Sequence, residues 1–219
     1  MNMKKKSILL IGVGKFGKYT AKELSKLGHE IMAVDHDEKR VNDIMPFVTS
    51  ALIGDSTNEK FLKRLDVEQY DVCIVTIGQD FQSSLETTYQ LKQLGAKKVV
   101  SRAERDGQAE LLKRSGADEV VYPEKQLASW VAIRYSADHI LDYIELDNDC
   151  SIFEVTVPKA WLGKSILEID VRRKYNVNII AVREGGKLNA SVTPGIILTE
   201  SKTLLVLGEY KDLQKCFGI

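Results

Sequence analysis

The strongest chemical signal in the sequence is a glycine-rich turn, Gly12-Val13-Gly14-Lys15-Phe16-Gly17, which follows an apolar run and precedes a helical pattern. Gly12 permits a tight turn, Gly14 lets backbone amides approach a phosphate, and Gly17 allows the helix to pack closely on a sheet. The first N–H groups of that helix have no partners within it, so they favour an anion. The motif predicts that this turn binds the phosphates of a nucleotide.

Asp35 ends the second apolar run, where a carboxylate can accept hydrogen bonds from the hydroxyl groups of a ribose. The same negative charge would repel a 2′-phosphate, so the sequence disfavours NADP as a ligand. In a purely structural alternative, the glycines only turn the chain and Asp35 caps the helix that follows. The shared register of strand, glycines and acid favours nucleotide binding over that alternative.

Three further polar positions follow predicted strands. Asp55 and Ser56 come after the third apolar run, and Arg102 comes after the fifth. Ligands bind at the carboxyl ends of parallel strands, so these side chains could contact a nucleotide. Equally, Asp55 and Ser56 could form an ordinary turn and helix N-cap, and Arg102 a surface salt bridge. Lys15 adds a positive charge beside the phosphates, which suggests a highly charged ligand such as ADP or ATP.

Glu124 follows Pro123 in the first turn of a predicted helix, where the helix dipole stabilises an acidic side chain. If Glu124 faces phosphate instead, a cation must lie between the two negative groups. Both interpretations stay open, and the second makes Glu124 a ligand of Mg²⁺ or another cation that accompanies ATP.

A parallel sheet covered by helices would bring these residues together. The predicted strands are the short apolar runs near residues 8–13, 31–35, 51–53, 72–77, 98–101 and 119–122. The predicted helices lie between them, near residues 16–27, 38–44, 58–65, 82–94 and 108–113. Residues 1–123 are therefore expected to form an α/β domain with a Rossmann-like, doubly wound parallel sheet that binds a nucleotide.

The rest of the chain changes pattern twice. Residues 124–143 read as one long connecting helix, which ends before the acidic turn Asp147-Asn148-Asp149. Apolar and polar residues then alternate over 153–157. Gly185-Gly186 separates two short runs, at 179–184 and 187–190, as expected for a β-hairpin, and residues 203–207 give a further strand. Residues 144–219 are predicted to form a small α+β domain.

Composition narrows the function classes. The 219 residues include 31 basic and 31 acidic side chains, so the formal net charge is zero. The protein therefore lacks the excess positive charge that general binding to nucleic acid or anionic membranes requires. No stretch approaches the ~18 apolar residues of a membrane span. The run after Lys4-Lys5-Lys6 is too short for a signal peptide. The three cysteines are far apart in sequence and are expected to be reduced thiols. These features favour a cytoplasmic protein that does not insert into a membrane and binds no nucleic acid.

Taken together, the motifs resemble the RCK (regulator of potassium conductance) family, in particular its KtrA/TrkA type. The supporting segments are the glycine turn, Asp35, residues 54–57, Tyr122-Pro123-Glu124-Lys125, residues 164–166 through Arg172, Asn178-Ile179-Ile180 and Thr193-Pro194-Gly195. They extend over essentially the whole chain. No single segment is specific, whereas the set is.

The resemblance implies a regulatory subunit that forms a homodimer and then an octameric ring. The ring would dock on a membrane potassium-translocating subunit of the KtrB/TrkH type, peripheral to the inner face of the cell membrane. ATP and ADP would compete for one site, with Glu124 and a metal ion near the γ-phosphate. The residues implied to contact the nucleotide are Gly12, Gly14, Lys15, Phe16, Gly17, Asp35, Asp55, Ser56, Arg102 and Glu124. Lys15 replaces an arginine that is frequent in the family, which keeps the charge without its bidentate geometry.

KtrA-type members can also bind cyclic di-AMP between two C-terminal subdomains. The matching positions here are Ile166, Asp170, Arg172, Asn178, Ile179, Ile180 and Pro194. On the structural alternative, the isoleucines form core, Arg172 is a solvated helix charge and Pro194 shapes a loop.

Two other function classes use a similar nucleotide-binding sheet. An NAD-dependent oxidoreductase fits the glycine turn and Asp35 equally well, yet none of His29, His36 and His139 is placed for hydride chemistry. A redox-sensing DNA-binding regulator would need a helix-turn-helix and a basic face, which residues 144–219 do not display. We therefore expect a nucleotide-sensing regulatory protein, not an enzyme, with the oxidoreductase as the alternative.

Overall fold

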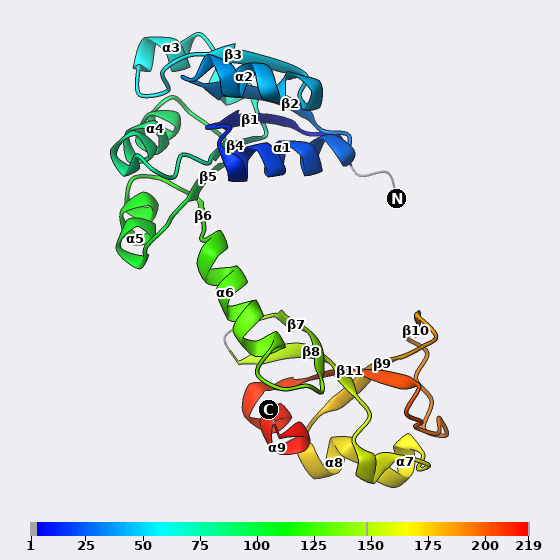
Figure 1. Ribbon diagram of the computed structural model, residues 1–219. Coiled ribbons are helices and arrows are strands. Elements are labelled where there is room, and N and C mark those ends of the chain that lie inside the picture. Colours follow the sequence, from blue (N-terminus) through cyan, green and yellow to red (C-terminus); the bar gives the residue numbers. More distant parts are fainter. Residues whose placement is uncertain (1–3, 148, 219) are drawn as a thin grey trace. The chain divides into compact units, whose positions relative to one another are not determined.

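The computed structural model describes residues 4–147 and 149–218. The chain divides into two compact units, Met1–Lys125 and Gln126–Ile219 (Figure 1). Asn148, in the acidic turn predicted to mark a boundary, lies outside the described residues. In the described part of the chain, no helix is both long enough and apolar enough to cross a membrane.

The first unit is built on a six-stranded parallel sheet with the order β3-β2-β1-β4-β5-β6. Its strands are β1 (Ser7–Ile11), β2 (Glu30–Asp35), β3 (Ser50–Ile53), β4 (Val72–Val75), β5 (Val99–Arg102) and β6 (Glu119–Val121). Its helices are α1 (Lys15–Lys26), α2 (Glu38–Ile44), η1 (Met45–Phe47), α3 (Glu59–Lys63), η2 (Val67–Gln69), α4 (Phe81–Gln93) and α5 (Asp106–Arg114). The predicted Rossmann-like, doubly wound fold is confirmed.

Helices cover both faces of this sheet, and each face has its own apolar core (Figure 1). Successive residues of a strand point to opposite faces. Leu10 accordingly packs in one cluster with Ala21 of α1 and Ile44 of α2, whereas Leu9 packs in the other with Leu91 of α4. Strands buried on both sides are uninterrupted apolar runs, which is why β1 carries no polar alternation.

The second unit holds a five-stranded antiparallel sheet with the order β10-β9-β11-β8-β7. Its strands are β7 (Ile140–Glu145), β8 (Cys150–Thr156), β9 (Asn178–Glu184), β10 (Lys187–Asn189) and β11 (Lys202–Glu209). Its helices are η3 (Lys159–Trp161), α7 (Ile166–Ile169), α8 (Val171–Tyr175) and α9 (Tyr210–Phe217). Its core includes Phe153, Leu204 and Leu213, which are fully buried.

The β9–β10 hairpin agrees with its sequence prediction. Gly185 and Gly186 connect the two strands, and both have positive φ, at +55° and +76°. A two-residue hairpin turn of this hand needs positive φ at both central positions, which glycine adopts without strain. The small α+β fold predicted for this part of the chain is therefore confirmed.

The prediction of one helix over residues 124–143 is wrong in its second half. Helix α6 (Pro123–Arg134) ends at Arg134, and strand β7 begins at Ile140. Pairing with β8 places Tyr143 opposite Phe153 and buries Ile140 completely. These contacts join residues that are ten or more positions apart, so tertiary pairing overrides the local helical pattern.

Candidate functional site

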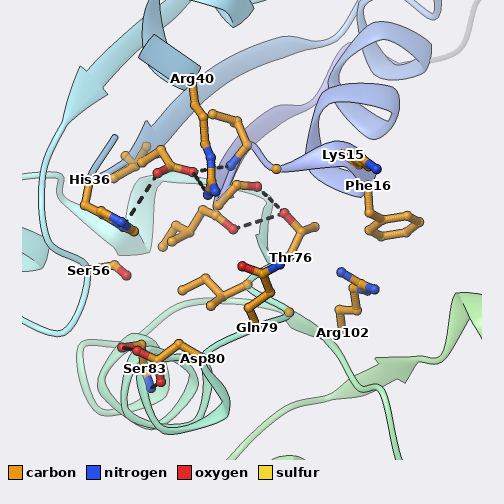
Figure 2. Close-up of a pocket in the computed structure, with 18 of the residues that line it drawn as sticks. Lys15, Phe16, His36, Arg40, Ser56, Thr76, Gln79, Asp80, Ser83 and Arg102 are labelled. Carbon is orange, nitrogen blue, oxygen red and sulfur yellow. Dashed lines mark hydrogen bonds and ion pairs between the residues drawn. The ribbon is translucent and has the colours of Figure 1, made fainter. Parts of the chain in front are cut away.

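A cavity of about 850 Å³ lies at the carboxyl ends of β1, β2 and β4 in the first unit (Figure 2). β1 and β4 are neighbours, and the strand order reverses between them. Ligands of such sheets bind in the crevice at this reversal. The predicted residues that line the cavity are Gly12, Gly14, Lys15, Phe16, Asp35, Asp55, Ser56, Arg102 and Glu124. Sequence positions more than a hundred residues apart therefore meet at one place.

The glycine turn connects β1 to α1, and each glycine has a separate steric reason. Gly12 has φ of +87°, a conformation that glycine adopts freely. A Cβ on Gly17 would lie 2.1 Å from the carbonyl oxygen of Gly12 and 2.6 Å from Oγ1 of Thr76. A Cβ on Gly14 would meet no described atom within 4 Å. Gly12 and Gly17 therefore shape the turn, and Gly14 leaves the N-terminus of α1 open to the cavity.

Asp35 is the last residue of β2, and its side chain is only 2% exposed. Oδ2 accepts a hydrogen bond from the backbone N–H of Val13 at 2.8 Å, and Oδ1 accepts one from that of Asp37 at 3.0 Å. The N-cap of α2 is Asp37, whose side chain accepts from the N–H of Arg40. The capping role considered for Asp35 thus falls to Asp37, and Asp35 holds the glycine turn.

Two nitrogen-bearing side chains, Arg40 and His36, lie beside Asp35 at what we call the Asp35 end of the cavity. A guanidinium nitrogen of Arg40 lies 3.7 Å from Oδ2, and Nδ1 of His36 lies 3.6 Å from Oδ1. Figure 2 shows the Arg40 side chain extending over the cavity. His29 instead accepts a hydrogen bond from the N–H of Lys6, at the other edge of the sheet.

Arg102 lies at the opposite end of the cavity from Asp35, which we call the Arg102 end. Its guanidinium carbon lies 5.6 Å from the ring centroid of Phe16, the second residue of α1. One guanidinium nitrogen donates to Glu124 and lies 3.1 Å from the carboxylate of Glu104. A Cβ on Gly78 would lie 2.4 Å from Arg102, so glycine leaves room for this cluster. Two carboxylates thus already surround the cation.

Asp55 and Ser56 differ in their surroundings. Oγ of Ser56 is buried and bonded to Oγ1 of Thr87 in α4 at 2.8 Å. Asp55 is exposed, and hydrogen bonds from the hydroxyl and the backbone N–H of Thr57 lower the pKa of its carboxyl. Asp55 therefore presents a stable negative charge beside the cavity.

Sequence reasoning missed several residues of the cavity, most clearly Thr76 and Arg40. Thr76 follows β4 directly, is 4% exposed, and donates its hydroxyl to the carbonyl oxygen of Gly12. Arg40 lies in the first turn of α2, and its guanidinium lies 3.7 Å from the carboxylate of Asp35. The signal that could have identified Thr76 is its position after a strand next to β1, since such residues share one sheet edge.

A cation site was predicted at Glu124. Among residues 4–147 and 149–218, no three His, Cys, Asp or Glu side chains are grouped to hold a metal ion. Mg²⁺ in nucleotide sites commonly uses one or two carboxylates and takes its other ligands from phosphates and water. Glu104 and Glu124, which both contact Arg102 beside the cavity, fit that donor set.

The residues matched to cyclic di-AMP binding all lie in the second unit. Ile166 begins α7, Arg172 is exposed in α8, and Asn178 to Ile180 begin β9. The carbonyl oxygen of Pro194 accepts from the N–H of Leu167, so the Pro194 loop lies against α7. Ile166 and Ile179 pack against the core of this unit. Asp170, between α7 and α8, has φ of +52°.

Comparisons with known proteins agree on both units. The TrkA-N domain family matches residues 8–123, and the TrkA-C domain family matches residues 151–217. The chain is 36% identical over 211 residues to the Ktr system potassium uptake protein C of Bacillus subtilis (strain 168), which covers 96% of each chain. It is 34% identical over 213 residues to the Ktr system potassium uptake protein A of the same organism, which covers 97% of this chain and 96% of that one.

A solved structure gives the same fold. The chain superposes on the GsuK channel bound to NAD with a TM-score of 0.69 at 20% identity. The match covers 96% of this chain and 38% of the channel chain, so this protein spans well under half of that solved chain. At this identity, the likeness shows the fold alone.

Proposed function

Because this chain belongs to the TrkA-N and TrkA-C family, the KtrA/TrkA type of RCK protein, we propose that it is a nucleotide-sensing regulatory subunit of a potassium uptake system. It would act in the cytoplasm on a membrane potassium-translocating subunit of the KtrB/TrkH type. Identity of 36% and 34% to two Ktr system potassium uptake proteins, each nearly over its full length, supports this role. In this role the protein is a binding and gating component, not an enzyme.

The cavity of the first unit is the observation that carries the proposal. It combines a carboxylate for ribose hydroxyls at the Asp35 end, the open N-terminus of α1 at its middle and a guanidinium at the Arg102 end. An adenine nucleotide matches that order, with its ribose on Asp35 and its phosphate chain directed toward Arg102. ATP and ADP would compete for this one site, and NAD, which also carries an adenosine ribose, is the alternative ligand.

Glu124 would hold a cation beside the terminal phosphate of ATP. Glu124 is half-exposed in the first turn of α6 and lines the same cavity as the glycine turn. A carboxylate facing a phosphate is repulsive unless a cation neutralises both. Mg²⁺ or a similar ion would supply that charge.

The second unit would bind cyclic di-AMP across a homodimer, and the dimers would assemble into an octameric ring. Cyclic di-AMP has two-fold symmetry, so an isologous interface can present the same groups to both halves of the ligand. The exposed Arg172 of each subunit could pair with one phosphate. Ligand binding across subunits would then bias their arrangement, as gating requires.

A ligand panel tests this function directly. Thermal unfolding would be followed with ATP, ADP, NADH, NADPH and cyclic di-AMP. A ligand at ~100 times its Kd stabilises the folded chain by about 2.7 kcal/mol. We expect stabilisation by ATP, ADP and cyclic di-AMP, and nucleotide-dependent potassium flux when the protein is reconstituted with its membrane subunit in vesicles. A chain that responds to NADPH but not to ATP or ADP would contradict the proposal.

A further inference from the structure

The guanidinium at the Arg102 end already has carboxylate partners. The same nitrogen contacts Glu104 and Glu124, and the Arg102 side chain is only 14% exposed. Its Nε is buried and has no hydrogen-bond partner among the residues that the structure describes. Arginine has five N–H donors in a planar fork that suits phosphate. The guanidinium therefore has an N–H donor without a partner in the described part of the chain, while its positive charge is already balanced by the two carboxylates.

The two carboxylates are held differently. Glu104 lies two residues beyond Arg102 on the same segment, whereas Glu124 comes from the first turn of α6. The side chain of Glu124 is 58% exposed, against 40% for Glu104. The more exposed carboxylate loses less when it returns to water. Glu124 is thus the partner that an incoming anion would replace.

The position of Arg102 determines which anions can reach it. Figure 2 shows Arg102 and Phe16 facing each other, on the opposite side of the cavity from His36. With the ribose at Asp35, a first phosphate would lie at the glycine turn, and only a longer phosphate chain would extend to Arg102. A monophosphate would leave the contact between Arg102 and Glu124 intact.

We propose that Glu124 makes the site sensitive to phosphate-chain length, because its carboxylate competes with the terminal phosphates of a nucleotide for Arg102. This inference rests on the proposed nucleotide function of the same cavity. When a long phosphate chain binds, Arg102 exchanges the carboxylate for phosphate oxygens, and Glu124 is released. The released Glu124 carboxylate is then available to a cation. The same side chain therefore has two successive partners, Arg102 before the nucleotide binds and the cation afterwards.

Titration calorimetry with AMP, ADP and ATP in EDTA tests the exchange without any divalent cation. In Glu124→Gln, Arg102 has lost a competitor, so the nucleotides that reach it should bind roughly two- to fivefold tighter, as expected for a half-exposed ion pair. AMP affinity should not change. Asp106→Asn is the matched control. Asp106, in α5, pairs at 2.7 Å with Lys125, which follows Glu124 in the first turn of α6, and Asp106 does not line the cavity.

A double-mutant cycle separates competition from simple repulsion. Arg102→Met should weaken ADP or ATP. In that background Glu124→Gln should tighten binding less than it does with Arg102 present, since only direct repulsion between Glu124 and phosphate is then removed. Equal tightening by Glu124→Gln with and without Arg102 would overturn the exchange and leave only long-range repulsion. Unchanged or weaker ADP and ATP binding by Glu124→Gln in EDTA, or equal tightening of AMP, would also overturn it.

The wild-type titrations distinguish the two proposals. If no adenine nucleotide binds the unsubstituted protein, the proposed nucleotide function fails together with the exchange. If ADP or ATP binds and the cycle shows no coupling between Arg102 and Glu124, only the exchange fails. Thermal unfolding of each variant without ligand confirms that the substituted chains remain folded.

Discussion

The carboxylate of Asp35 accepts a hydrogen bond from the backbone N–H of Val13 at 2.8 Å, so the last residue of β2 holds the glycine turn that follows β1. Its other oxygen accepts from the N–H of Asp37. One side chain therefore fixes two loops at the rim of the cavity. Asp35 therefore has a structural role, and in the proposed function a ribose would use its remaining acceptor capacity.

Replacing Asp35 with alanine should weaken ATP, ADP and NAD alike, because all three carry the same adenosine ribose. It should also destabilise the chain, since each buried N–H left without a partner costs about 1–3 kcal/mol. Asp37→Ala is a matched control: loss of the α2 N-cap costs about 1 kcal/mol and leaves the ribose carboxylate in place. Calorimetry and thermal unfolding measure both effects. Unchanged affinity in Asp35→Ala would mean that the ribose binds elsewhere.

Gly17→Ala should destabilise the chain more than Gly14→Ala. The Cβ at position 17 overlaps the carbonyl of Gly12, and such overpacking costs about 1–3 kcal/mol. The Cβ at position 14 points into open space, so the loss there should stay below about 1 kcal/mol. Gly14→Ala should instead weaken nucleotide binding by blocking the approach of phosphate to the N-terminus of α1. Equal destabilisation by the two substitutions would refute this assignment of roles.

On the proposed cation site, magnesium should tighten ATP more than ADP, because the cation would be held between Glu124 and the terminal phosphate. In Glu124→Gln that difference should shrink, since the amide is a poorer ligand for Mg²⁺. Calorimetry with and without Mg²⁺ measures the difference. With Mg²⁺, the substitution weakens ATP, whereas in EDTA it tightens ATP, so the sign should reverse. An equal effect of Mg²⁺ on both nucleotides would exclude this cation site.

Cyclic di-AMP should bind the full chain at one ligand per two chains, and Arg172→Ala should abolish that binding. Each phosphate would lose a charge-assisted pair with one guanidinium. Lys174→Ala is a control on the same helix, because Lys174 is an exposed basic residue outside the matched positions. Calorimetry gives the stoichiometry and the affinity. Loss of binding in both variants to the same degree would indicate a nonspecific charge effect.

Acid should destabilise the second unit through Glu154. Its carboxylate accepts two hydrogen bonds from Arg183 and one from Thr203, and these hold the pKa of Glu154 below its ordinary value of 4.5. A lowered folded-state pKa stabilises the folded chain above that ordinary value, and this stabilisation is lost as the pH falls through the folded-state pKa. Unfolding free energies of wild type and Glu154→Gln should therefore converge as the pH is lowered below 4.5. A constant difference across that range would exclude this ion pair as the cause.

Local sequence was sufficient for the elements whose signals are short-range. The glycine turn, the apolar run of β1 and the Gly185-Gly186 hairpin were all predicted from adjacent residues, because backbone conformation at those positions depends on their own side chains. The sequence also predicted the edge of the sheet at which the candidate site residues gather, since parallel strands place their carboxyl ends together.

Only the tertiary structure decided the strand β7 and the partners of the charged residues. Residues 140–143 have a helical pattern, but pairing with β8 determined their conformation. Likewise, the sequence placed Arg102 and Glu124 at the same sheet edge without pairing them, and it did not pair Thr76 with Gly12. Contacts across 22 and 64 positions depend on how the sheet is assembled, because hydrogen bonds and ion pairs between distant segments leave no periodic pattern in either one.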